Sequence, residues 1–265
     1  MMRWTGSNAA MLRRLLPLVV FAWCGVPFAA VALVGGAAPA PDHARSVVMI
    51  AGSRGNSCTG ALVARDLVLT AAHCVPPGAE YKLVTFDADR RPLLRDTVRV
   101  ERHPQFSQQA FDNHRATADV ALIKLAAPVA GAAPVALFGG KFSVAPGDMF
   151  VVVGYGLTRQ NDGRSGGTLR TARLIATGRP GNLQIRLFDP ATRNAQAGLG
   201  ACTGDSGAPV FVGDNGRLSV IGVVSWSTGA GNSEGCGGLT GVTPLSLYRP
   251  WLVDIARKLG SPLAP

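Results

Sequence analysis

The sequence has little charge and no repetition. Only 16% of its 265 residues are charged whereas 47% are hydrophobic, and disordered chains show the opposite balance. No repeat of fixed period and no coiled-coil heptad occurs, which argues against solenoids and fibres. The formal net charge is +10, but the basic residues form no dense run and no RNA-binding motif. The charge therefore indicates solubility and adhesion to acidic surfaces, and we do not expect nucleic acid as a partner.

Metal-binding patterns are also missing. One of the five cysteines lies at position 24, and the others lie at 58, 74, 202 and 236. No pair among these four has the Cys-x-x-Cys spacing of structural zinc sites. No loop has the dense carboxylates of a calcium site. Two disulfides are therefore favoured over a zinc site, and they would form in an oxidising compartment. Spacing alone leaves three pairings open. We expect no metal and no cofactor.

The N-terminus has the pattern of an export signal. Three arginines precede an apolar stretch that begins at Leu15, and no acidic residue occurs before Asp42. This order predicts a secretory signal peptide at residues 1–32 that ends in the small-x-small sequence 30–32. Residues 38–40 also fit a cleavage site, and an uncleaved membrane anchor is a further alternative, although two prolines would weaken its helix. We expect a secreted or periplasmic protein that contacts a membrane only if the signal stays uncleaved.

The rest of the chain consists of short apolar runs separated by turn residues, and it contains 33 Gly and 18 Pro in all. These lengths predict an all-β sandwich or pair of barrels. The predicted strands are 47–51, 61–63, 67–70, 83–86, 98–101, 120–125, 150–154, 169–176, 183–188, 209–212 and 220–226. A Pro-, Gly- and Ala-rich stretch at 126–140 predicts a linker between two β halves, 33–135 and 136–265. From Ser246 onward, apolar residues recur at helical period, which predicts a terminal amphipathic helix.

Three segments carry residues that together could form a nucleophilic site. His73 follows an apolar strand, Asp119 opens another, and Ser206 stands in the turn Gly-Asp-Ser-Gly before a third. A serine hydroxyl is a poor nucleophile, so it needs an adjacent base, and the base needs a carboxylate that fixes its tautomer. Each residue alone has an ordinary structural explanation. Together, in the order His, Asp, Ser, they supply every part that an activated serine requires.

With these motifs, the sequence resembles the trypsin/chymotrypsin-type serine proteases over nearly the whole chain from Leu33 onward. The resemblance implies two packed antiparallel β-barrels, a C-terminal α-helix and an active site in the cleft between the barrels. It implies that His73 is the general base, Asp119 its orienting partner and Ser206 the nucleophile. The backbone N–H groups of Gly204 and Ser206 would form the oxyanion hole.

The resemblance also assigns a role to the residues after the signal. Family members become active when a terminal sequence such as Ile-Val-Gly-Gly folds inward and its ammonium pairs with the aspartate before the serine. Here Leu33 begins the sequence Leu-Val-Gly-Gly, and Asp205 is the matching acid. Because Ala32, not Lys or Arg, precedes Leu33, we expect signal peptidase itself to create the activating terminus. The resemblance further implies the disulfides Cys58–Cys74 and Cys202–Cys236.

The substrate pocket is predicted to differ from that of trypsin. Ser225, Trp226 and Ser227 match the strand that pairs with the substrate backbone and lines the primary pocket, and Ser227 would narrow its mouth. The pocket base falls at Gly200, where trypsin carries an aspartate, and Gly241 is expected to keep the far wall open. Without a buried anion, an arginine or lysine side chain would lose charge solvation on entering. We therefore predict a preference for neutral side chains, small or apolar.

Together, these features predict a secreted, monomeric serine endopeptidase that hydrolyses protein or peptide substrates through an acyl-enzyme. A catalytically silent binding or scaffold protein of the same fold is the alternative. Such proteins usually lose a triad residue, and none is lost here. The Ala-, Gly- and Arg-rich composition, with no sign of a propeptide, suggests a bacterial member of the family.

Overall fold

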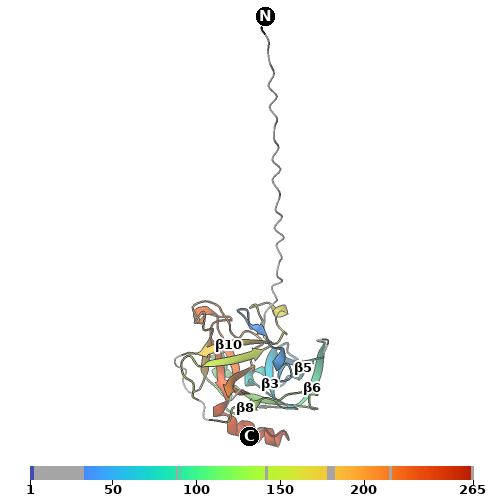
Figure 1. Cartoon of the computed structure of the whole chain (residues 1–265). Helices are drawn as coiled ribbons and strands as arrows, with labels where there is room; N and C mark the ends of the chain where they lie inside the picture. Colours follow the sequence, from blue (N-terminus) through green and yellow to red (C-terminus); the bar gives the residue numbers. More distant parts are fainter. Residues whose placement is uncertain are drawn as a thin grey trace.

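The structure is a computed structural model of the whole chain (Figure 1). It describes residues 1–2, 33–87, 89, 91–140, 143–177, 183–214 and 217–263. The predicted signal peptide lies almost entirely outside the described residues, at 3–32, so it stays a prediction. Among the helices that the described residues form, none combines the length and the apolar character needed to span a bilayer.

Six antiparallel strands close the first barrel in the order β2-β3-β4-β7-β6-β5. Their bounds are β2 (Val47–Gly52), β3 (Ser57–Ala64), β4 (Leu67–Thr70), β5 (Tyr81–Phe86), β6 (Pro92–Arg102) and β7 (Ala121–Leu125). Two short elements project from this barrel: the 3-10 turn η2 (Ala72–Cys74) follows β4, and the helix α1 (Gln108–Asp112) lies between β6 and β7. Both elements carry residues of the candidate site described below.

The second barrel has the order β10-β11-β14-β13-β12-β9 and closes where β9 pairs with β10. Its strands are β9 (Met149–Gly154), β10 (Arg170–Ala176), β11 (Ile185–Phe188), β12 (Pro209–Asp214), β13 (Arg217–Ser227) and β14 (Thr240–Pro244). The short strand β1 (Ala38–Pro39) extends this sheet beside β10, and β8 (Ala136–Leu137) pairs in parallel with β13. The remaining 3-10 turns are η1 (Pro41–His43), η3 (Gly163–Ser165), η4 (Ala230–Asn232) and η5 (Leu245–Leu247).

The barrels lie side by side, with β3, β5 and β6 on the right of Figure 1 and β10 on the left. The strands at their junction are buried on both faces. Val68 of β4 packs in the core of the first barrel, while its neighbour Leu69 packs with Phe211 of the second. Because successive side chains of a strand point to opposite faces, β4 fills two cores at once. This double burial explains why its sequence is a continuous apolar run and not an alternating one.

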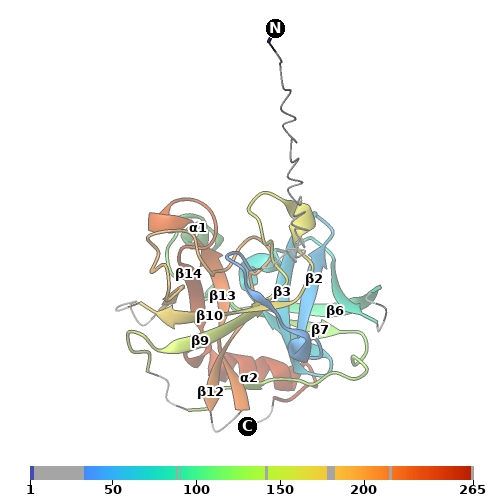
Figure 2. The ribbon, with the colours of Figure 1, turned by 45° about the horizontal axis from the view of Figure 1, so that its top comes forward.

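The C-terminal helix α2 (Arg249–Lys258) follows η5 and buries Leu252 and Ala256, which lie one turn apart on one face. It begins at Arg249, three residues later than expected. Its first turn contains a proline, which is tolerated there because the first N–H groups of a helix have no partner within the helix. In the view of Figure 2, α2 and α1 lie at opposite ends of the molecule. The expected fold, two packed antiparallel β-barrels with a C-terminal helix, is confirmed. The division of the chain at residue 135 stays a prediction.

Candidate active site

The pairing of β4 with β7 brings His73 and Asp119 together, because one follows β4 and the other precedes β7. The Nδ1 atom of His73 lies 2.8 Å from Oδ2 of Asp119, and the His73 backbone N–H donates to Oδ1 at 2.9 Å. Asp119 is fully buried. A carboxylate at Nδ1 holds the proton on that nitrogen and makes Nε2 the basic one. The pair therefore has the orientation that a histidine base needs.

Ser225 has a contact that the sequence did not reveal. Its hydroxyl donates to Oδ2 of Asp119 at 2.5 Å, and its side chain is buried. The Asp119 carboxylate thus faces donors on the first barrel, at His73, and on the second barrel, at Ser225. A buried charge is stable only when it is hydrogen-bonded in this way. Ser225 is therefore a positioning residue for Asp119, in addition to its place on the strand predicted to bind substrate.

Ser206 stands in the tight turn that precedes β12. The flanking glycines Gly204 and Gly207 have φ of 92° and 78°, in the left-handed region that favours glycine. A Cβ on Gly207 would lie 2.1 Å from Oγ1 of Thr70 and 2.4 Å from the carbonyl oxygen of Thr59, both in the first barrel. No side chain fits there. The turn is therefore pressed directly against strands β3 and β4, next to η2.

His73, Gly204 and Ser206 line one cleft of about 380 Å³ between the barrels. Side chains from both barrels enclose it, so it exists only when they are packed together. The full lining is Asn56, Ser57, Cys58, His73, Cys74, Phe111, Ala201, Cys202, Thr203, Gly204, Ser206, Val224, Ser225, Trp226 and Ser227. Histidine and serine chemistry, with backbone N–H groups nearby, is available in this cleft.

The two glycines assigned to the primary pocket do not line this cleft among the described residues. Gly200 is buried, and a Cβ there would lie 3.0 Å from the Cα of Gly237. Gly241 pairs with Trp226 across β13 and β14, and a Cβ on Gly241 would lie 2.0 Å from Cε2 of the indole. The expectation that Gly241 keeps the far wall open stays a prediction. The missing side chain makes room for the Trp226 ring, which fills that space.

Phe111 of α1 is a site residue that sequence reasoning missed. Its ring stacks on the imidazole of His73, with centroids 4.4 Å apart and planes inclined by 17°. The hydroxyl of Ser107 accepts the backbone N–H of Ala110 at 3.2 Å and so caps the helix. A serine three residues before a helical N–H is a usable start signal, but a five-residue helix is too short to show periodicity.

Asp205 is fully buried, and backbone donors hold both of its oxygens. The Gly156 N–H donates to Oδ1 at 2.8 Å, and the Cys202 N–H donates to Oδ2 at 3.0 Å. Burial raises the pKa of Asp205 to about 7, against the lowering effect of these two hydrogen bonds. The segment predicted to pair with it lies in the same barrel: Leu33 is fully buried, and Val34 forms a β-bridge with Gly200.

Both expected disulfides are present. Cys58 is bonded to Cys74, which ties η2 to β3, and Cys202 is bonded to Cys236, which ties the turn before β12 to the segment before β14. Cys58, His73 and Cys74 also lie close enough together to resemble a metal-binding group. Because both sulfurs are committed to the disulfide, this group offers no thiolate ligand.

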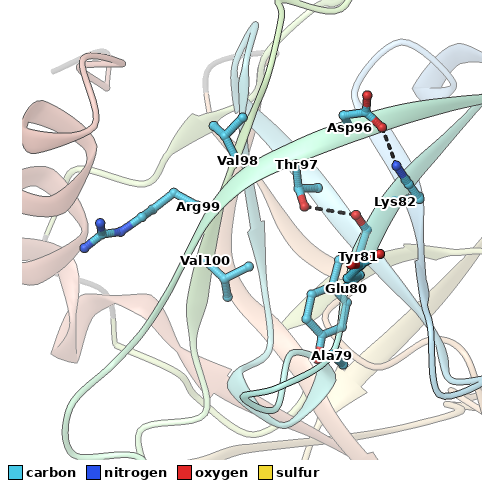
Figure 3. A pocket seen from close by; sticks show the side chains of 9 residues that line it. All are labelled: Ala79, Glu80, Tyr81, Lys82, Asp96, Thr97, Val98, Arg99 and Val100. Atoms are coloured by element: carbon cyan, nitrogen blue, oxygen red, sulfur yellow. Dashed lines mark hydrogen bonds and ion pairs between the residues drawn. The ribbon is translucent and has the colours of Figure 1, made fainter.

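A second hollow, of about 400 Å³, lies on the first barrel between β5 and β6 (Figure 3). An ion pair between Lys82 and Asp96 crosses it, and the Thr97 hydroxyl donates to the Tyr81 carbonyl oxygen at 2.9 Å. Its lining residues, all of them described, include no serine, cysteine or histidine. We assign this hollow no part in the chemistry of the candidate site.

Comparison with known proteins agrees with this geometry. Residues 33–252 match the model of the trypsin family. The chain is 31% identical to human serine protease 56 over 245 residues, which cover 84% of this chain but only 38% of that protein. It is 26% identical to the vitellin-degrading protease of Bombyx mori over 254 residues, which cover 85% of this chain and 86% of the relative.

A third relative is the vitamin K-dependent protein C of Mus musculus, 28% identical over 231 residues, which cover 80% of this chain and 48% of that protein. These three relatives are animal proteins, so the bacterial origin suggested by composition finds no support among them. The chain spans little more than a third of the length of serine protease 56. Since the family model covers most of the chain, including both strands that hold the His–Asp pair, the chain belongs to the trypsin family of serine proteases.

Proposed function

We propose that this chain is a serine endopeptidase with His73 as general base, Asp119 as its orienting partner and Ser206 as nucleophile. The observation that carries the proposal is the 2.8 Å contact between His73 Nδ1 and buried Asp119, at the wall of a cleft that Ser206 also lines. Membership of the trypsin family supports the same assignment. The family implies protein or peptide substrates, and we propose that the enzyme acts as a monomer.

The proposed reaction assigns a step to each of these residues. Nε2 of His73 takes the proton of the Ser206 hydroxyl as its Oγ attacks the scissile carbonyl carbon. The carbonyl oxygen becomes an oxyanion, which the N–H groups of Gly204 and Ser206 bind. The C–N bond then breaks, the leaving amine takes the proton from His73, and the acyl group stays on Ser206. Water hydrolyses the acyl-enzyme by the same route, with His73 again as base and then acid.

The chemistry of the cleft supports a preference for neutral substrate side chains next to the scissile bond. None of the residues that line the cleft, all of them described, is acidic. The carboxylate on the serine turn, Asp205, is fully buried and accepts hydrogen bonds from the backbone of Gly156 and Cys202. An arginine or lysine side chain would find no anion to replace its hydration. Because the Trp226 ring covers Gly241, we propose that small side chains are preferred.

We further propose that the chain is exported and that removal of residues 1–32 creates an ammonium group at Leu33 which pairs with Asp205. Two disulfides fit an oxidising compartment, which supports export. A buried carboxylate without a cationic partner is costly, and a terminal ammonium would relieve that cost. N-terminal sequencing of the exported protein tests this step, because a fully active protein that begins at residue 41 or later would contradict it.

Active-site labelling tests the main proposal. A fluorophosphonate probe should label the wild-type protein covalently and should not label Ser206→Ala. The variant should keep its fold, judged by circular dichroism, and lose about a millionfold in kcat, by analogy with other triads. Thr203→Ser, a change in a neighbouring cleft residue, serves as the matched control and should still be labelled. Labelling of neither protein would favour the silent scaffold, and equal labelling of both would show that a residue other than Ser206 is the nucleophile.

A peptide library then tests substrate preference. We expect cleavage after small neutral residues such as alanine or glycine, and cleavage mainly after arginine or lysine would refute the assignment of the pocket.

A further inference from the structure

One buried residue of the first barrel forms three hydrogen bonds to the second barrel, two of them to the serine turn. Thr59 of β3 is fully buried. Its backbone N–H donates to the carbonyl oxygen of Ser206 at 2.8 Å. Its hydroxyl donates to the carbonyl oxygen of Gly204, also at 2.8 Å, and accepts the backbone N–H of Tyr155 at 3.1 Å. Thr59 thus binds the carbonyl groups of the two residues that flank Asp205.

These contacts hold the peptide units that directly follow those carrying the proposed oxyanion donors, the N–H groups of Gly204 and Ser206. The Gly204 carbonyl is part of the peptide unit that follows the Gly204 N–H, and glycine turns freely about its own bonds. The peptide unit that carries the Gly204 N–H is held on one side by the Leu157 N–H, which donates to the Thr203 carbonyl oxygen at 2.8 Å, and the Thr59 hydroxyl holds the next unit. When the Thr59 hydroxyl holds the carbonyl, rotation of Gly204 is restricted, and the direction of its N–H is restricted with it.

The second bond of the hydroxyl completes the arrangement. Tyr155, which donates to the Thr59 hydroxyl, directly precedes Gly156, whose backbone N–H donates to Asp205. The Thr59 carbonyl oxygen in turn accepts the Thr70 hydroxyl at 2.9 Å, on the strand that leads to His73. The Thr59 hydroxyl uses its donor and an acceptor position, both with good geometry, so its rotation is fixed as well. One residue thereby joins the serine turn, the segment that supports Asp205 and the strand before the proposed base.

We propose that Thr59 is a positioning residue for the oxyanion hole, which holds the Gly204 N–H in the direction that the transition state requires. The role rests on the proposed function, because an oxyanion forms only if Ser206 attacks a carbonyl. Thr59 touches neither substrate nor reacting atoms. Its effect should therefore appear in kcat, because the oxyanion exists in the transition state and not in bound substrate.

Two substitutions separate the hydroxyl from the shape of the side chain. Thr59→Val keeps the branched shape and removes the hydroxyl, which leaves the Gly204 carbonyl and the Tyr155 N–H without their partner. Thr59→Ser keeps the hydroxyl. Removal of a direct oxyanion donor costs a factor of about 100 to 1,000 in kcat, and the loss of its orienting bond should cost a part of that. We expect kcat of Thr59→Val, per folded molecule, to fall about thirtyfold with KM nearly unchanged, and Thr59→Ser to stay within about threefold of wild type.

Thr59→Ala covers the case in which the valine variant fails to fold. It opens space in which a water can bond to both orphaned groups, so its stability loss should be smaller while kcat still falls. Equal kcat in wild type, Thr59→Val and Thr59→Ala, measured on folded protein, would overturn the proposal. So would a loss that Thr59→Ser shares, because the cause would then be the methyl group and its packing.

Hydrogen exchange supplies a readout that does not depend on turnover. Amides of the serine turn, such as the Asp205 N–H that donates to Cys202 and the Gly207 N–H that donates to Val224, report whether the turn stays ordered. We expect these amides to exchange about tenfold faster in Thr59→Val than in wild type, and at the wild-type rate in Thr59→Ser. If the wild-type protein neither hydrolyses peptides nor binds a fluorophosphonate, the proposed function fails, and exchange alone decides whether Thr59 holds the turn. Unchanged exchange in Thr59→Val would refute that role.

Discussion

The buried carboxylate of Asp205 allows a quantitative test of the proposed activation. In the full-length chain, burial raises the pKa of Asp205 from 3.8 to about 7. An acid with a raised pKa holds its proton more tightly in the folded state than in the unfolded chain, so stability falls as the pH rises between the two values. Between pH 5 and pH 7 the loss from this one group is about 2 kcal/mol.

The measurement is urea unfolding at both pH values with the disulfides intact, in a Ser206→Ala background that prevents self-digestion. Asp205→Asn is the control because it removes the titrating group, while other groups that titrate in this range, such as His43 and His103, contribute equally to both chains. Full-length protein should lose about 2 kcal/mol more between pH 5 and pH 7 than its Asp205→Asn variant. The asparagine amide cannot accept both backbone N–H groups, so the variant is less stable than wild type. This cost is the same at both pH values and does not affect the comparison.

The same comparison in a chain that begins at Leu33 tests the proposed ion pair. An α-ammonium, with an ordinary pKa of about 7.7 to 8, is charged over most of this range and would keep Asp205 ionised in the folded state. The loss of stability between pH 5 and pH 7 should then disappear. If the shortened chain loses as much as the full-length one, the ammonium does not reach Asp205. If neither chain differs from its asparagine variant, burial does not raise the pKa, and the reasoning fails at its first step.

Two further predictions concern contacts outside the serine turn. Lys124 lies 2.5 Å from both Asp66 and Ser261. Although desolvation opposes the shift, hydrogen bonds from Lys124 and Ser261 lower the pKa of Asp66. Lys124→Met should therefore cost about 2 kcal/mol in urea unfolding at neutral pH, and the cost should shrink once Asp66 is protonated in acid; an equal cost at both pH values would contradict this. Phe111→Ala removes the ring stacked on His73, and since such pairs contribute about 1 kcal/mol, kcat for a peptide substrate should fall about fivefold while Phe111→Tyr stays near wild type. A kcat unchanged in Phe111→Ala would show that the ring does not steady the imidazole.

Strands with two buried faces were the easiest part of the fold to predict. The bounds of β4 (Leu67–Thr70) agree with the predicted strand at every residue, because each of its side chains enters a core and must be apolar or small. For β6 (Pro92–Arg102), only 98–101 was predicted. Its first half lies in an exposed hairpin, where Leu94 is 67% exposed, and an exposed strand leaves no apolar pattern to read.

A missed strand shows how local signals mislead. Strand β14 (Thr240–Pro244) contains a glycine and ends in proline, which favours a turn, yet every residue in it is buried. Its glycine is required by the indole of Trp226, which lies on the neighbouring strand. Contacts of this kind join segments that are distant in sequence. The Thr59–Gly204 bond spans 145 residues, and no local pattern in either segment predicts it.

The candidate site depends on the contact between the barrels more than on either barrel alone. Asp119 belongs to the first barrel, but the Ser225 hydroxyl that holds it comes from the second. Gly204 belongs to the second barrel, but the Thr59 hydroxyl that holds it comes from the first. Each barrel thus supplies the support for a functional group on the other. Because the supports are reciprocal, a small shift of one barrel against the other disturbs the base and the oxyanion donors together, even if every strand stays intact. Activity should therefore report on the apolar contact between the barrels, where Leu69 packs with Phe211, more sensitively than secondary structure does.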